Sequence, residues 1–178
     1  MTTLVSFDGI NGNYPSRNLV ADASGNIYGT THLGGARGIG TLFELAAGTH
    51  ALSTLVSFNS NCGSPQGSLI ADVNGNLYGT TLGGGTDGDG TVFEIASGTH
   101  ALTTLASFVQ CNGTTDNPTG SLLADADGNL FGTTYSGGAY GYGTIFEVTA
   151  STHTLLTLVT FDGTNDESAT PHGPRTTP

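Results

Sequence analysis

The sequence predicts an all-β protein, a β-propeller-like array of three four-stranded meander blades. Two observations favour this fold class. The chain of 178 residues has 29 glycines and only 10% charged residues, a composition typical of turns and strands rather than of solvated helices. A phenylalanine also recurs about every 50 residues, and such a period indicates stacked or radially arranged units. The recurring residues are Phe7, Phe58, Phe108 and Phe161.

The second repeat displays the four expected strands most clearly. They are residues 68–72, 76–81, 90–96 and 102–108. Their lengths are those of ordinary strands. Asn74-Gly75 joins the first two, and such a pair supplies the positive φ angles of a two-residue hairpin turn. A second tight turn, at 97–100, joins the last two, so the four strands form one antiparallel meander.

Domain 1–161 is expected to hold three repeats, at about 8–58, 59–108 and 109–161, preceded by an extra strand 2–7 and followed by a Pro/Thr-rich tail 162–178. Strands such as "VFEI" carry apolar residues on both faces, as sheets packed between other sheets require. Radial packing of blades meets this need. A β-trefoil also uses three four-stranded units of this size, and it stays open as the alternative.

Three blades are fewer than the four to eight that usually close a propeller. An open stack would leave an apolar face at each end, which monomeric proteins rarely expose. The expected partner is therefore a second copy of the chain, in a homo-oligomer or a filament.

The loops that differ most between repeats are the glycine-rich loop between the second and third strands and the long loop between repeats. Both emerge on the same face of a meander blade, and variable loops on a repeated scaffold usually carry binding specificity. The tyrosines among them could stack on sugar rings or fill a protein interface. The candidate ligand-binding residues are Tyr135, Tyr140, Tyr142, Arg37, Asp87 and Asp89. Other residues of these loops are Tyr14, Arg17, His32, Asp116 and Asn117.

Charge and composition exclude several function classes. A formal charge of −11 repels nucleic acid and anionic membranes, and no apolar run approaches the length of a membrane span. The glycine runs lack the Lys-Ser/Thr of a phosphate-binding loop, so no cofactor is expected. The two cysteines, Cys62 and Cys111, are expected to be free thiols, since equivalent loops on neighbouring blades seldom approach within bonding distance.

Three polar residue types recur once in every repeat, and each has a structural interpretation. An aspartate before each hairpin can accept backbone N–H bonds of the turn. A histidine in each later turn is expected to be a turn residue, because one per blade places them too far apart for a shared metal. A glutamate in each third strand is expected to serve its own blade rather than catalysis. These residues are Asp22, Asp72 and Asp125; His50, His100 and His153; and Glu44, Glu94 and Glu147.

The repeated motif D-x-x-G-N-[IL]-[YF]-G-T-T-x-x-G-G, followed by G-T-[LVI]-F-E, resembles the GloVer-type tandem repeat of bacterial surface proteins with varied anchors. It is more loosely similar to the propeller repeats of two-component regulators. The resemblance covers residues 1 to about 161. It implies a propeller-like array in an exported protein that is displayed at the cell surface.

These observations together predict a non-enzymatic extracellular or cell-surface binding or adhesion scaffold with a carbohydrate or protein ligand. One alternative is a self-assembling structural subunit of a fibre or surface array. A polysaccharide-active enzyme is the other, although no convergent pair of carboxylates is evident in the repeat pattern.

Overall fold

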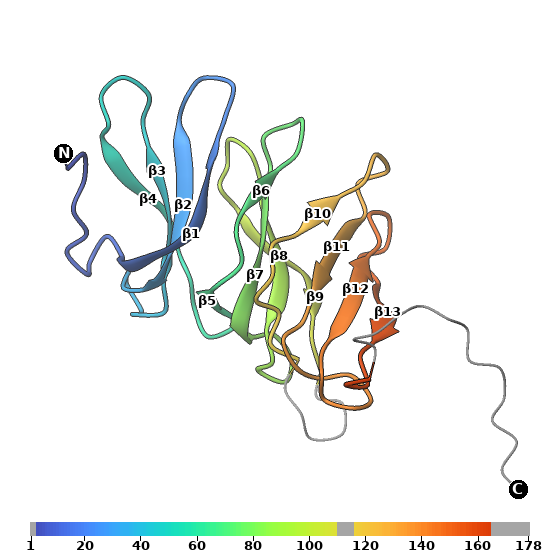
Figure 1. Cartoon of the computed structure of the whole chain (residues 1–178). Helices are drawn as coiled ribbons and strands as arrows, with labels where there is room; N and C mark the ends of the chain where they lie inside the picture. The colour runs from blue at the N-terminus through green and yellow to red at the C-terminus, as the bar shows by residue number, and fades with distance from the viewer. Residues whose placement is uncertain (1–2, 110–115, 165–178) are drawn as a thin grey trace, which may run out of the picture.

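The computed structural model describes residues 3–109 and 116–164, apart from the side chains of residues 16 and 17. These residues form strands and turns without a helix, in three antiparallel sheets. Figure 1 shows the sheets side by side in a row, with β1–β4 at one end and β10–β13 at the other. The all-β, three-bladed prediction is therefore confirmed. The trefoil alternative is wrong, because the row has two outer sheets and does not close on itself.

Blades 1 and 3 are meanders whose neighbouring strands are consecutive in the chain, and blade 2 differs only in that both β5 and β6 pair with β7. Blade 1 consists of β1 Asn13–Ala21, β2 Ile27–Leu33, β3 Thr41–Leu45 and β4 Leu52–Ser57. Blade 2 consists of β5 Cys62–Pro65, β6 Ile70–Ala71, β7 Leu77–Gly84, β8 Thr91–Ile95 and β9 Leu102–Ser107. Blade 3 consists of β10 Leu123–Ala124, β11 Leu130–Thr133, β12 Thr144–Val148 and β13 Leu155–Thr160.

The first strand of each blade differs most from the sequence expectation. In blade 2 it is split into β5 and β6, which both pair with β7. In blade 1 the strand is continuous, but its register shifts between Ser16 and Val20. The expected strand 68–72 thus shrinks to two residues, while β7 extends three residues beyond the expected 76–81 and supplies the edge for β5.

A buried pair of threonines fixes the register at the start of the third strand in every blade. In blade 1 the hydroxyls of Thr31 and Thr41 lie 2.8 Å apart, and the Thr41 N–H donates to Thr31 Oγ1. The corresponding hydroxyls of Thr81 and Thr91 are also 2.8 Å apart. Each buried hydroxyl is thus satisfied inside its own blade, as buried polar groups require.

The hydrophobic core lies between the blades rather than within them. One cluster joins blades 1 and 2 around Phe58 and Phe93, and a second joins blades 2 and 3 around Phe108 and Phe146. In both clusters a phenylalanine just after the last strand of one blade meets, edge to face, a phenylalanine of the third strand in the next, at centroid distances of 5.2 and 5.0 Å. Each blade therefore depends on its neighbour for burial.

The expectation of an extra strand at 2–7 is wrong, because the described residues 3–7 form no strand. A last strand hydrogen-bonds to the third strand of its own blade, and the described residues provide no such third strand before β1. Phe7 nevertheless packs edge to face on Phe43, with the ring centroids 5.1 Å apart. It therefore holds the position that Phe58 and Phe108 hold at the two blade junctions.

Cys62 is a free, buried thiol whose sulfur lies 3.3 Å from the Thr91 hydroxyl, and burial raises the pKa of this thiol. Cys111 and all but the first three residues of the tail 162–178 lie outside the described residues. Across the parts of the chain that the structure describes, no helix has the length and apolarity needed to cross a membrane.

Candidate functional site

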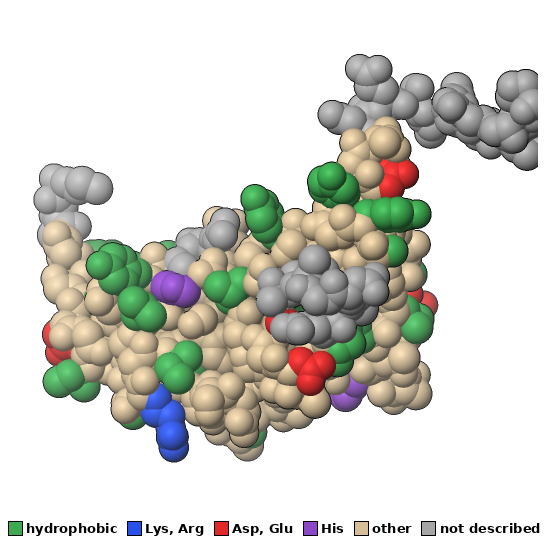
Figure 2. Space-filling model, turned by 90° about the horizontal axis from the view of Figure 1, so that it is seen from below, with side chains coloured by type: hydrophobic (Ala, Val, Ile, Leu, Met, Phe, Trp, Pro, Cys, Tyr) green, Lys and Arg blue, Asp and Glu red, His purple; other side chains and the backbone are tan. Residues whose placement is uncertain are grey.

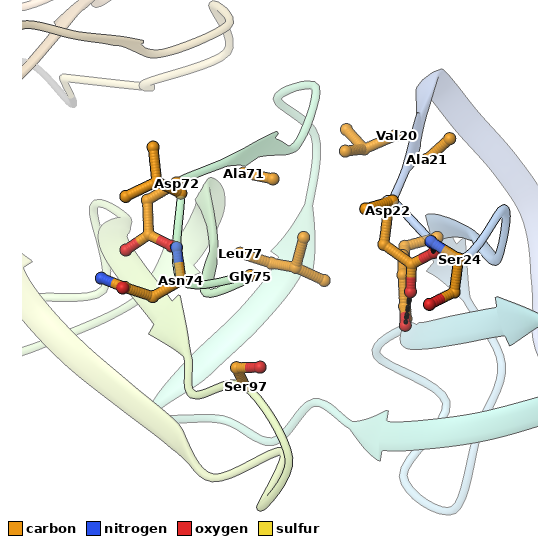
Figure 3. A pocket seen from close by; sticks show the side chains of 13 residues that line it. Val20, Ala21, Asp22, Ser24, Ala71, Asp72, Asn74, Gly75, Leu77 and Ser97 are labelled. Carbon is orange, nitrogen blue, oxygen red and sulfur yellow. Dashed lines mark hydrogen bonds between the residues drawn. The ribbon is translucent and has the colours of Figure 1, made fainter.

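A cavity of about 370 Å³ lies between blades 1 and 2, where the first hairpin of each blade turns. Figure 3 shows Asp22 and Asp72 on opposite walls, with Leu77 between them. A smaller cavity, of about 200 Å³, lies at the next junction and is lined by Tyr78, Glu94 and other residues.

Both oxygens of the Asp72 carboxylate accept hydrogen bonds within its own hairpin. Its Oδ1 accepts the N–H groups of Asn74 and Asn76, at 2.8 and 2.9 Å. Its Oδ2 accepts the Asn76 amide at 2.9 Å and the Tyr78 hydroxyl at 3.1 Å. Burial opposes ionisation of Asp72, but these bonds outweigh it and lower its pKa below the usual value. Burial, together with the charges of Glu94 and Asp72, raises the pKa of Tyr78 to about 12.

Asp22 makes the same contacts to Ser24, Asn26 and Tyr28 in blade 1. Blade 3 repeats the turn around Asp125 but has Phe131 in place of the tyrosine. The structural interpretation of these aspartates is therefore correct. The aspartates that line the larger cavity stabilise the turns. This cavity is therefore not the candidate functional site.

Replacing Asp72 with Ala is expected to lower the free energy of unfolding by about 2 kcal/mol, because four donors lose their acceptor. The loss is expected only where Asp72 is ionised. Its pKa is lowered in the folded state, so its stabilisation is present above pH 3.8 and disappears as the pH falls through the lowered value. Urea unfolding at pH 7 and at pH 2.5 measures both effects. Asp87→Ala, an exposed loop change, should leave stability unchanged; an equal loss there would contradict this account.

The predicted ligand residues lie on the loop face of the blades, and all but one are exposed. Tyr135, Tyr140 and Tyr142 project from the loop between β11 and β12. Arg37 and Asp87 are exposed in the corresponding loops of blades 1 and 2. Figure 2 shows the molecule from below, where hydrophobic side chains stand out from the surface. The role of these five residues in ligand binding stays a prediction.

Asp89 is the exception, because it turns inward and is only 3% exposed. It comes from the loop between β7 and β8 and lies near Asp116, which precedes blade 3 and is 9% exposed. Burial and the negative charge of Asp89 raise the pKa of Asp116, although a hydrogen bond from the Gly138 N–H acts in the opposite direction. Within residues 3–109 and 116–164, Asp89 Oδ2 and Asp116 Oδ1 have no hydrogen-bond partner. These two side chains form the candidate site.

The equivalent place between blades 1 and 2 is apolar. Ile39 holds the loop position of Asp89, and Gly63 holds that of Asp116. A Cβ at Gly63 would come within 2.6 Å of Ile39 Cγ2, so the two residues fit closely together. The sequence did place Asp89 and Asp116 in the variable loops, but nothing in the repeat pattern showed that the charge of one would act on the other.

The recurring histidines are turn residues, as expected. His50, His100 and His153 have φ angles of 54°, 53° and 52°. The N–H of each donates to the carbonyl four residues earlier. Glu94 accepts a hydrogen bond from the Tyr78 hydroxyl at 3.3 Å, which is a role within its own blade. Among residues 3–109 and 116–164, no group of three or more His, Cys, Asp or Glu side chains could hold a metal ion.

Comparison with known proteins identifies both the repeat and the fold. The family model described as the Gloeobacter/Verrucomicrobia repeat matches residues 1–116 and again 64–177. No curated protein matches the sequence. Among solved structures, the chain is similar to a gluconolactonase from Xanthomonas campestris, with a TM-score of 0.51 and 16% identity over 80% of this chain and 46% of that one. The chain thus spans about half the length of that protein, and the likeness supports the propeller-like fold.

The predicted non-enzymatic binding or adhesion role is corrected by this comparison. The solved structure with the similar fold is that of an enzyme, a gluconolactonase. A row of propeller blades with variable loops is therefore no argument for a non-enzymatic scaffold.

Proposed function

The chain belongs to the Gloeobacter/Verrucomicrobia repeat family, and from its repeat architecture we propose that it functions as one half of a closed β-propeller ring that a second copy completes. The outer face of blade 3 would pack on the outer face of blade 1 of the other copy. Both junctions of the ring would then repeat the junctions that already exist inside the chain.

The outer face of blade 1 supports this proposal most strongly. Leu19 is 60% exposed, whereas the equivalent Leu69 and Leu122, which face a preceding blade, are 4% and 5% exposed. Full burial of a leucine contributes roughly 2 kcal/mol. The same position is thus an uncovered apolar side chain in one blade and a core residue in the other two.

The outer face of blade 3 presents the complementary surface. Leu123, Leu158 and Val159 are exposed there, and Phe161 is half-buried. The equivalents of Phe161 at the two internal junctions, Phe58 and Phe108, are fully buried. Blade 3 therefore offers a second copy the same kind of apolar face that blades 1 and 2 offer to their neighbours.

The contact between Phe7 and Phe43 marks where this interface would form. At both internal junctions, the ring that meets the third-strand phenylalanine comes from the preceding blade. Phe161 of a second copy would take that position on Phe43. Residues 3–7 form no strand and are not tied into a sheet, so the incoming blade would displace Phe7.

Two copies also fit the size of a closed propeller. The three blades span 46% of the gluconolactonase chain, and six blades lie within the usual range of four to eight. A junction between unlike faces closes into a ring when its rotation brings the last blade back to the first, and otherwise grows into a filament.

Sedimentation equilibrium of the purified chain is the test. The expected mass is twice the 17.9 kDa of the chain at micromolar concentration. Higher salt should strengthen the association, because each copy carries a formal charge of −11. A monomer at all concentrations would overturn the proposal, and so would open-ended growth into filaments.

A further inference from the structure

Asp89 and Asp116 are two buried carboxylates, and the described residues around them do not offset the cost of burying their charge. One oxygen of each, Asp89 Oδ2 and Asp116 Oδ1, has no hydrogen-bond partner among the residues that the structure describes, although both side chains are more than nine-tenths buried. A buried carboxylate without a partner is costly, and a second one nearby adds repulsion. A positive charge at this place would remove both penalties.

The sequence offers little positive charge of its own. Lys and Arg together number three, against 14 Asp and Glu. Arg37, the arginine whose side chain the structure describes, is exposed on the loop of blade 1. Among the described side chains, none therefore supplies this charge to the pair, and a cation from solution would do so.

Packing of the blades does not require this pair. The junction between blades 1 and 2 places Ile39 against Gly63 at the same positions and needs no charged group there. Blades 2 and 3 could pack in the same way with apolar residues. Two acids at this one junction thus indicate a role besides packing.

From these observations we propose that Asp89 and Asp116 bind a divalent cation, Ca²⁺, which links the loop after β7 to the segment that enters blade 3. Carboxylate oxygens are the ligands that Ca²⁺ prefers, and backbone carbonyls and water complete its usual six to eight. Gly88 and Gly90 flank Asp89 in the sequence. Gly137 lies so close that a Cβ there would overlap Asp116 Oδ1.

This inference concerns a junction inside one chain and does not rest on ring closure. Calorimetric titration of the chelator-treated chain with CaCl₂ alone is expected to give one site per chain. Ca²⁺ should raise the melting temperature by about 5 °C or more at saturation. Asp89→Asn and Asp116→Asn should each weaken binding at least tenfold, whereas Asp87→Asn, on the same loop but exposed, should bind as the unmodified chain does.

A double variant keeps the test valid if the single variants fold poorly. Asp89→Ile with Asp116→Gly copies the pair found between blades 1 and 2, so it should fold, and its melting temperature should not respond to Ca²⁺. Absence of both heat and a melting shift at millimolar Ca²⁺ would overturn the proposal. A Ca²⁺ response that persists in the double variant would also overturn it.

Discussion

Phe93→Ala is expected to destabilise the chain by about 4 kcal/mol, the typical cost of emptying a buried phenylalanine site. Phe93 is 0% exposed and meets Phe58 edge to face, and it packs in the cluster that joins blades 1 and 2. The cavity would open at the junction between two blades, where neither sheet can collapse independently. Chemical denaturation, with the midpoint and the slope both fitted, measures the loss.

Phe7→Ala is the matched control. Phe7 makes the same kind of ring contact, on Phe43, but it is only half-buried and belongs to no strand. Its removal is expected to cost about 1 kcal/mol or less. Equal losses for Phe7→Ala and Phe93→Ala would contradict a core that lies between the blades.

Leu158→Asp is expected to weaken self-association by about 100-fold or more, because an interface centre tolerates a buried unpaired charge poorly. Leu158 lies on the outer face of blade 3 and is 49% exposed in a single chain, so folding should change little. Leu19→Asp, on the outer face of blade 1, should have the same effect from the other side of the junction.

Val73→Asp provides the control for these charge substitutions. Val73 is fully exposed at a hairpin tip and lies on neither outer face. The variant should associate as the unmodified chain does, measured by light scattering over a concentration series. Dissociation by Val73→Asp would show that added charge alone, rather than its place on an outer face, disperses the chains.

The sequence predicted strands best where turn signals bound an apolar run. The expected strands 90–96 and 102–108 match β8 Thr91–Ile95 and β9 Leu102–Ser107 within one or two residues. It missed β5 Cys62–Pro65, whose residues lack an apolar pattern and are extended because β7 offers them an edge. Pairing of that kind depends on tertiary structure and leaves no local signal.

The sequence predicted the loops that carry the candidate site, but not that two of their side chains come together. The expectation that variable loops share one face predicts Asp89 and Asp116 on the same side of the blades, and in the structure the charge of Asp89 acts on Asp116. They lie close enough to interact electrostatically where the loop of one blade meets the entry of the next. Whether a loop residue points outward, as Asp87 does, or into that junction, as Asp89 does, depends on packing between blades. A repeat pattern read from one chain does not contain this information.

Mixing the two charge variants tests the central claim most directly. In a two-copy ring, each Leu19→Asp or Leu158→Asp chain on its own meets an aspartate at both junctions. A mixed pair retains one junction whose two faces are both unmodified, namely blade 3 of the Leu19→Asp chain on blade 1 of the Leu158→Asp chain. Each variant alone should therefore sediment as a 17.9 kDa monomer, and the equimolar mixture should sediment at twice that mass. A mixture that remains monomeric would contradict the pairing of blade 3 with blade 1, as would variants that dimerise on their own.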